Sequence, residues 1–123
     1  MSKHALLIED EPNIIEAIRF ILSRDGWRVS THETGADATE VIARTAPDIV
    51  ILDVMLPGRS GYDILDALRA AEATRALPVL MLTAKGQTAD RERAARHGAT
   101  RFMTKPFANA DLVAAARAML APT

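Results

Sequence analysis

Four short apolar runs in this chain each lead into a polar side chain, and this repeat constrains the possible folds more than any other feature of the sequence. Runs of this length between helical segments are typical of strands in an open parallel sheet. The carboxyl ends of such strands meet at one crevice, where these folds bind ligands. We therefore expect the polar residues after the runs to lie close together. They are Glu9 and Asp10 after Leu6–Ile8, Asp53 after Ile49–Leu52, Thr83 after Val79–Leu82, and Lys105 after Phe102–Thr104.

The order of strand and helix patterns predicts an α/β fold with a doubly wound, five-stranded parallel sheet. Strand patterns alternate with helix patterns, as in repeated βαβ units whose helices cover both faces of the sheet. The run Ile49–Leu52 is apolar without alternation, which is expected of a central strand. Strands are predicted at His4–Ile8, Trp27–Thr31, Asp48–Leu52, Pro78–Leu82 and Phe102–Thr104. Helices are predicted from Pro12 to before Gly26, over Gly35–Thr45, around Ile64–Ala71, over Gln87–His97 with Gly98 as a left-handed cap, and from an N-cap at Asn109 to Leu120.

The composition narrows the class of protein. A chain of 123 residues, 49% of them apolar, suffices for one domain, which we expect to cover residues 1–123. With 15 basic and 16 acidic side chains, there is no reason to expect direct nucleic-acid binding. The chain has no cysteine for disulfides, and its first apolar run is too short for a signal peptide or a membrane span. We therefore expect a cytoplasmic protein without membrane attachment.

The acidic side chains at the predicted strand ends indicate a site for a divalent cation. Glu9, Asp10 and Asp53 provide hard oxygen ligands with excess negative charge, which suits Mg²⁺. Asp53 is the best placed for a second role, because an aspartate carboxylate can attack phosphorus to form an acyl phosphate. Structural explanations also exist, since Asp53 can simply end a strand in solvent, and acids near residue 9 can complement the dipole of the following helix. Neither of these explanations accounts for both features.

Thr83 and Lys105 complete a set of groups suited to phosphoryl transfer, in which catalysis depends on positioning and charge stabilisation. Taken alone, Thr83 is better explained by a hydrogen bond to nearby backbone, and Lys105 by an ordinary surface position. Their equivalent places at the ends of two strands favour the functional interpretation. Either isomer of the Lys105–Pro106 bond is compatible with the sequence.

Four motifs occur in order along the chain: Leu7–Glu11, Leu52–Gly61, Leu82–Lys85 and Thr104–Phe107. Together they resemble the receiver domain of bacterial two-component response regulators, and the loop motifs look closest to the OmpR type. The resemblance extends over the whole chain and implies a (βα)5 fold of the flavodoxin and CheY kind, with strand order 2-1-3-4-5. It also implies a signalling protein that catalyses its own phosphorylation and dephosphorylation, rather than an enzyme acting on an external substrate.

The resemblance implies a role for each residue of the cation and phosphoryl site. Asp53 would accept a phosphoryl group from the phosphohistidine of a sensor histidine kinase or a phosphotransfer protein. Asp10 would bind Mg²⁺ directly and Glu9 through water, and the backbone carbonyl of Met55 would act as a ligand together with Asp53. Lys105 would hold a phosphoryl oxygen.

The resemblance also implies a conformational switch. Thr83 would move to bond the phosphate and draw Phe102 inward, where many relatives carry a tyrosine instead. Met55 and Lys85, two residues beyond Asp53 and Thr83, would influence hydrolysis of the acyl phosphate, and bulk at both positions predicts slow autodephosphorylation. Phe102 has a structural explanation as well, as a core aromatic on a short strand, which is compatible with the switch role.

The sequence gives less information about what the receiver controls. OmpR-type receivers form homodimers through their fourth helix, fifth strand and fifth helix, and carry a DNA-binding domain downstream. Here Thr100 and Arg101 stand in place of the usual acids, and Ala115 in place of a common basic residue, so these positions lack the charges of the usual ion-pair network between subunits. The chain is expected to control either a separate partner protein or an output domain removed from its carboxyl end.

Three other classes of protein share part of this sequence pattern. A hydrolase or phosphatase of the same architecture also combines an aspartate nucleophile with Mg²⁺, but commonly needs an acid where Met55 stands. A pseudo-receiver that binds partners constitutively would not need the full set of acids with Thr83 and Lys105. A flavin-binding, flavodoxin-like module would need a phosphate-cradling loop after the first strand, which is lacking here.

Overall fold

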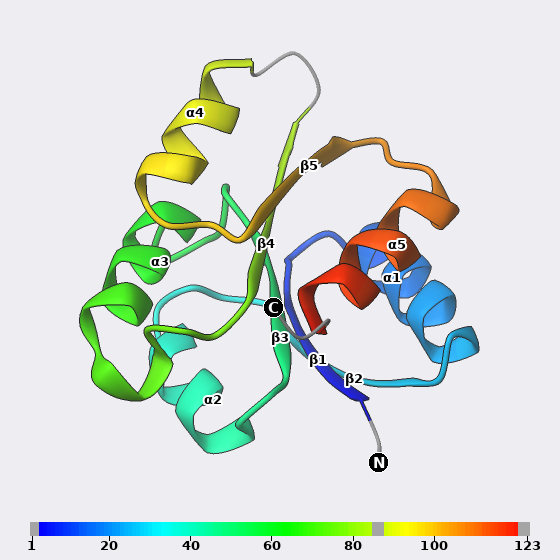
Figure 1. Cartoon of the computed structure of the whole chain (residues 1–123), viewed down its shortest axis with the longest axis horizontal. Helices are drawn as coiled ribbons and strands as arrows, with labels where there is room; N and C mark the ends of the chain where they lie inside the picture. Colours follow the sequence, from blue (N-terminus) through cyan, green and yellow to red (C-terminus); the bar gives the residue numbers. More distant parts are fainter. Residues whose placement is uncertain (1–2, 85–87, 121–123) are drawn as a thin grey trace.

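A sheet of five parallel strands forms the centre of the fold (Figure 1). The structure, a computed structural model, describes residues 3–84 and 88–120, with the side chains of residues 88–90 left aside. The strands are β1 (Lys3–Ile8), β2 (Trp27–His32), β3 (Ile49–Asp53), β4 (Val79–Ala84) and β5 (Arg101–Lys105). Their spatial order is β2-β1-β3-β4-β5, which confirms the predicted fold class and strand order.

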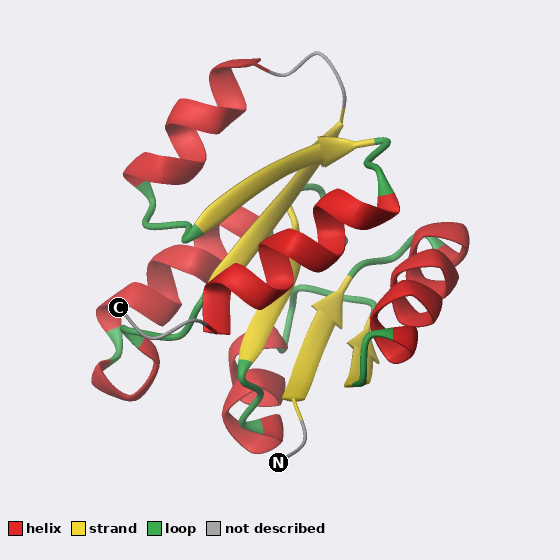
Figure 2. Ribbon diagram, turned by 45° about the vertical axis from the view of Figure 1, so that its right-hand side comes forward, coloured by secondary structure: helices red, strands yellow, loops and turns green. Residues whose placement is uncertain are grey.

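Helices cover both faces of the sheet. They are α1 (Pro12–Arg24), α2 (Ala38–Thr45), α3 (Gly61–Ala70), α4 (Thr88–Arg96) and α5 (Asn109–Leu120), with a short 3-10 helix, η1 (Glu72–Thr74), after α3. Helices α1 and α5 lie against one face, and α2, α3 and α4 against the other (Figure 2). In the part of the chain that the structure describes, no helix has the length and apolar character needed to cross a membrane.

Alternate side chains of the central strands enter the two layers. Leu7 and Ile51 pack beneath α1 and α5, whereas Ile8 and Leu52 pack beneath α2 and α3, and all four are fully buried. Each such side chain contributes about 1.5–3 kcal/mol on burial. Packing on both faces makes the carboxyl ends of β1 and β3 a firm base for any group placed there.

Two helices begin at other residues than the sequence predicts. α2 begins at Ala38 rather than Gly35, because Gly35 lies in a turn, where its N–H donates to the carbonyl of Pro57 at 2.9 Å and its own carbonyl accepts from Ala38 N at 3.2 Å. Asn109 is the first residue of α5 rather than its N-cap. The carbonyl that accepts the first helical hydrogen bonds belongs to Ala108, so the chain enters the helix one residue earlier than predicted.

The strand ends extend further than the apolar runs. Asp53 and Lys105 are the last residues of β3 and β5, and Thr83 lies inside β4, because ladder pairing continues past the last apolar residue. The short helix η1 was not predicted, since its three residues are too few to show a period. The predicted start of the fourth helix at Gln87 lies outside the described residues.

Polar contacts attach α4 to the rest of the molecule. Of the α4 side chains that the structure describes, Ala94 alone is buried. The guanidinium carbon of Arg93 lies 4.2 Å from the ring centre of Tyr62 in α3, and the ring of His97 lies 5.0 Å from the same ring. His97 Nδ1 also forms a hydrogen bond with Asp66 of α3. With so little apolar burial among its described side chains, α4 is weakly attached to the sheet.

Gly98 ends α4 in the left-handed conformation, with φ +94°. The N–H groups of Gly98 and Ala99 donate to the carbonyls of Ala95 and Ala94 at 3.1 and 3.0 Å, which is the Schellman pattern. This confirms the predicted cap.

Gly61 begins α3 directly against the end of β3. A Cβ atom at this position would lie 2.3 Å from the carbonyl oxygen of Asp53 and 3.0 Å from Cα of Val54. We expect Gly61→Ala to lower the free energy of unfolding by about 1–3 kcal/mol, the usual cost of forced overpacking, as measured by urea denaturation. Ser60→Ala, which removes the N-cap bond from Asp63 N and costs about 1 kcal/mol, is the reference variant. Unchanged stability of Gly61→Ala would contradict the close contact.

Candidate functional site

Polar side chains converge where four strands end. Because the strands are parallel and paired in register, with Asp53 opposite Leu82, their carboxyl ends lie at the same edge of the sheet. Glu9 follows β1, Asp53 ends β3, Thr83 precedes the last residue of β4, and Lys105 ends β5.

The three predicted acids are close enough to share one cation. Carboxylate oxygens of Glu9, Asp10 and Asp53 all lie within 4.8 Å of one another. Glu9 is fully buried and Asp53 is 4% exposed, whereas Asp10 is exposed, so the cluster opens to solvent on the side of Asp10. Among the residues that the structure describes, no other group of three or more acids or histidines has this spacing.

Backbone donors orient two of these carboxylates. Oε2 of Glu9 accepts hydrogen bonds from the N–H groups of Asp10 and Glu11 at 3.1 and 3.2 Å. Oδ1 of Asp53 accepts from Met55 N at 3.4 Å. The other oxygen of Glu9, Oε1, is buried and lies 2.9 Å from the ammonium group of Lys105.

The ammonium group of Lys105 lies among three carboxylates. Its Nζ is 2.9 Å from Glu9 Oε1, 3.2 Å from Asp53 Oδ2 and 3.3 Å from Glu11 Oε1. The contact with Oε1 is a close ion pair rather than a directed hydrogen bond. The Lys105–Pro106 peptide bond, which the sequence left open, is cis. Glu11 was not assigned to the site from the sequence. An acid directly before a helix is already explained by the helix dipole, so nothing in the sequence indicated a further role.

Burial and neighbouring charges shift the protonation of this cluster. Burial raises the pKa of Glu9, contact with Lys105 opposes the rise, and the charge of Asp53 adds to it, so the pKa moves from 4.5 to about 7. Burial alone would lower the pKa of Lys105, but the close contact with Glu9 and the charges of Asp53 and Glu9 raise it well above its usual range. Lys105 therefore remains charged, and one proton on Glu9 relieves the repulsion between the acids.

The donor set fits Mg²⁺. All the side-chain ligands are hard carboxylate oxygens, which lie within 4.8 Å of one another. A hollow of about 560 Å³ beside them provides room for a cation with its water molecules and a phosphoryl group. It is lined by Asp10, Glu11, Ile14, Asp53, Met55, Ala84, Lys105 and Pro106.

Thr83 and Phe102 lie on the face of the sheet covered by α3 and α4. Thr83 follows Met81 by two residues in β4, and Met81 belongs to the apolar cluster of that face. Phe102 pairs with Met81 across the ladder and packs against the same cluster, with the guanidinium carbon of Arg91 5.2 Å from its ring centre. A hollow of about 470 Å³ adjoins Thr83 on this side. Lys85, predicted to influence hydrolysis, lies outside the described residues.

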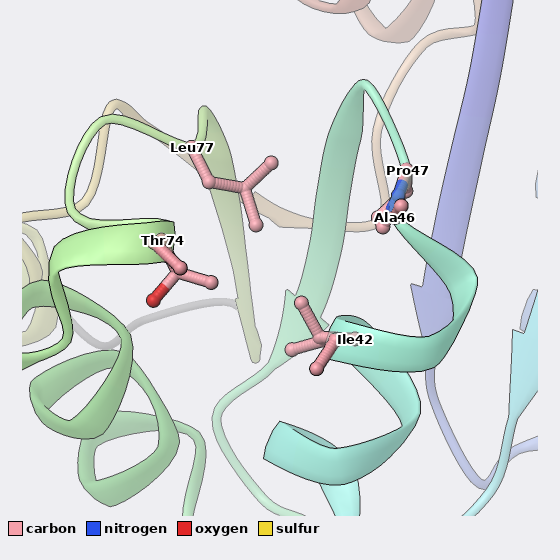
Figure 3. A pocket seen from close by; sticks show the side chains of 7 residues that line it. Ile42, Ala46, Pro47, Thr74 and Leu77 are labelled. Atoms are coloured by element: carbon pink, nitrogen blue, oxygen red, sulfur yellow. The ribbon is translucent and has the colours of Figure 1, made fainter.

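A further cavity, of about 280 Å³, lies at the opposite end of the sheet, before the starts of β3 and β4 (Figure 3). None of the side chains that line it is ionisable, so it offers no group for metal binding or acid–base chemistry. Its lining residues are Ile42, Ala43, Ala46, Pro47, Ala73, Thr74 and Leu77.

Comparisons with known proteins agree on one family. The family model of the response regulator receiver domain matches residues 5–117. A relative from Mycobacterium tuberculosis, described as the transcriptional regulatory protein TcrX, is 40% identical over 118 residues, which are 96% of this chain and 50% of the relative. The chain thus spans about half the length of this curated relative.

Solved structures show the same likeness. A response regulator from Chloroflexus aurantiacus superposes with a TM-score of 0.95 at 31% identity, covering 99% of this chain and 100% of that one. The receiver domain of the sensor histidine kinase PA1611 from Pseudomonas aeruginosa, solved with a magnesium ion coordinated in its active site cleft, gives a TM-score of 0.88 at 30% identity and covers 98% of both chains.

The parallel sheet in this strand order, with acids and a lysine at its carboxyl edge, defines a phosphoacceptor signalling domain. The chain belongs to the family of response regulator receiver domains, which the family match and the relatives show. It is therefore a signalling protein of the two-component type, whose family interacts with histidine kinases and output domains. Membership favours a receiver over the hydrolase and flavin-binding alternatives.

The raised pKa of Glu9 predicts a pH dependence of stability in the absence of divalent cations. The folded protein binds the Glu9 proton more tightly than the unfolded chain does, so the free energy of unfolding falls as the pH rises from about 4.5 to about 7. Glu9→Gln removes this contribution, and we expect the variant to gain stability relative to the parent protein across that window.

Urea denaturation in chelator at several pH values measures the effect, with Glu72→Gln, an exposed acid at the other end of the sheet, as the control. Parallel stability curves for Glu9→Gln and the parent protein would contradict the assigned pKa.

Proposed function

We propose that this chain is a phosphoacceptor receiver in which Asp53 takes a phosphoryl group from the phosphohistidine of a sensor histidine kinase or a phosphotransfer protein. The observation that supports this most directly is the placement of Asp53, almost fully buried at the end of β3 and 3.2 Å from the ammonium group of Lys105. A carboxylate held beside a fixed positive charge is suited to attack on phosphorus, because phosphoryl transfer depends on positioning and charge stabilisation.

In the proposed reaction, a carboxylate oxygen of Asp53 forms a bond to phosphorus while the bond from phosphorus to the histidine nitrogen of the donor breaks. The electron pair of that bond returns to the imidazole ring, which takes up a proton. The product on this chain is an aspartyl phosphate. Lys105 exchanges a carboxylate contact for a phosphoryl oxygen and so offsets the added negative charge.

The residues of the acidic cluster would hold Mg²⁺, with Asp10 and Asp53 as direct ligands, Glu9 acting through water, and the carbonyl of Met55 completing the protein ligands. Bound there, Mg²⁺ would neutralise charge on the phosphoryl oxygens. Support comes from the spacing of the three carboxylates and from the similar receiver of PA1611, which holds magnesium in its active site cleft.

Phosphorylation would act on the α4 and β5 region through Thr83 and Phe102. A phosphoryl group adds negative charge beside Thr83, and a charge-assisted hydrogen bond to its hydroxyl would favour one arrangement of the neighbouring loop. Phe102 shares this face of the sheet, and α4 is held mainly by polar contacts. A small free-energy difference at Thr83 would therefore suffice to reposition α4.

The similarity to longer regulators suggests what this receiver would control. The curated relative is a transcriptional regulator of about twice this length, so this chain would control either a partner protein or an output domain of a longer regulator. A homodimer through α4, β5 and α5 is a second candidate output, and the chain itself would not bind nucleic acid. We propose that residues 1–123 form one receiver domain acting in the cytoplasm.

Met55 is 77% exposed beside the acidic cluster, where its side chain can restrict the approach of water to phosphorus. Slow autodephosphorylation of the chain therefore remains our prediction.

Incubation with a small phosphodonor and Mg²⁺ tests the acceptor. The parent protein should gain the mass of one phosphoryl group in acid-labile form, and Asp53→Asn should gain none, because the amide is a poor nucleophile. Intact-mass measurement with and without chelator gives the readout, and Asp63→Asn, an exposed aspartate of α3, is the matched control. Uptake by Asp53→Asn equal to that of the parent protein would place the acceptor elsewhere.

Replacing Thr83 separates phosphorylation from switching. Thr83→Val keeps the shape of the side chain but removes a charge-assisted hydrogen bond of about 1.5–3 kcal/mol. We expect this variant to be phosphorylated yet to lose most of the phosphorylation-dependent change in amide hydrogen exchange over residues 91–96 and 101–105. Thr104→Val, which replaces the hydroxyl paired with Thr83 on β5, is the control. A full exchange response in Thr83→Val would exclude the proposed switch role.

A further inference from the structure

Glu11 is an acid of the site whose position neither the metal cluster nor helix capping requires. It is the N-cap residue of α1, and its backbone carbonyl accepts from the N–H groups of Ile14 and Ile15 at 3.1 and 3.0 Å. Its side chain makes no cap hydrogen bond. Instead, Oε1 reaches across to Lys105 Nζ at 3.3 Å, between residues 94 positions apart in the chain.

The position of Glu11 differs from that of the other two partners of Lys105. The side chains of Glu9 and Asp53 are 0% and 6% exposed, whereas that of Glu11 is 60% exposed. Glu11 also lines the hollow into which Asp53 and Lys105 open. It therefore places a negative charge at the entrance through which a phosphodonor must approach Asp53. Its carboxylate also contacts the ammonium group of Lys105, which the phosphoryl group would need to contact.

We propose that Glu11 determines which phosphodonors this receiver accepts, by discriminating against donors of high negative charge. The proposal rests on the proposed function of Asp53 as the phosphoryl acceptor. A dianionic donor is repelled by the Glu11 carboxylate as it enters, whereas a donor with lower net charge is repelled less.

The exposure of the Glu11 carboxylate sets how strongly its charge changes the rate at which donors reach the site. Charges at a solvent-exposed entrance interact through water and are screened by salt, with a Debye length of about 10 Å at 0.1 M ionic strength. Removing one such charge should change the encounter rate of a dianion by about three- to tenfold at low salt. The change for a monoanion should be less than about threefold, and both changes should shrink as salt is added.

The experiment compares two small donors on the whole chain at pH 7 and low ionic strength. Acetyl phosphate is a dianion there, and phosphoramidate carries less net charge because its nitrogen can be protonated. We expect Glu11→Gln to raise the phosphorylation rate constant with acetyl phosphate about three- to tenfold, to raise that with phosphoramidate clearly less, and to lose the difference at high salt. Each variant is measured at its own saturating Mg²⁺ concentration, since the lost carboxylate also lowers the attraction for the cation.

Two further variants separate the charge of Glu11 from other effects. Glu11→Asp keeps the charge at the entrance but shortens the reach toward Lys105, so it should resemble the parent protein in donor selectivity. Glu72→Gln removes one negative charge at the far end of the sheet and should leave the ratio of the two rate constants unchanged.

An unchanged ratio in Glu11→Gln would overturn the inference, and so would Glu11→Asp behaving like Glu11→Gln, which would assign the effect to the position of Lys105. Phosphorylation that persists in Asp53→Asn would instead overturn the proposed acceptor. The two failures are therefore distinguishable.

Discussion

The placement of one lysine among buried acids is the interaction on which the site depends. Glu9 and Asp53 lie almost without solvent at neighbouring strand ends, where their charges repel each other and lack the stabilisation of water. Lys105, within 3.3 Å of both, offsets part of this cost, and the raised pKa of Glu9 shows that the compensation is incomplete. A site with residual negative charge of this kind has an intrinsic affinity for a divalent cation.

The apolar core makes this strained arrangement possible. The central strands are packed on both faces by fully buried aliphatic side chains, so their carboxyl ends cannot move apart to relieve repulsion among the acids. The charged groups are held at fixed separations, and a ligand that supplies positive charge does not need to reorganise them. This is the preorganisation that electrostatic catalysis of phosphoryl transfer requires.

Stability is distributed unevenly around the site, and the distribution suits a signalling protein. β1 and β3 are deeply buried. Of the α4 side chains that the structure describes, only Ala94 is buried, and contacts of Arg93 and the following His97 with Tyr62 and Asp66 join this region to α3. Cation–π and exposed ionic contacts contribute about 1 kcal/mol each, far less than the burial of an apolar helix face. The buried strands position the acidic cluster, and α4 is the more weakly attached element.

The sequence alone determined the architecture and most of the site. Strand and helix periods predicted the parallel sheet, and the family resemblance implied its strand order. The polar residues at equivalent strand ends predicted the grouping of Glu9, Asp10, Asp53 and Lys105, because parallel pairing brings the carboxyl ends of strands to one edge of the sheet. Only the tertiary structure decided the cis isomer of Lys105–Pro106, the contact of Glu11 with Lys105 and the attachment of α4 through Tyr62. These depend on side-chain directions and on distances between segments far apart in the chain, and no local period in a sequence encodes them.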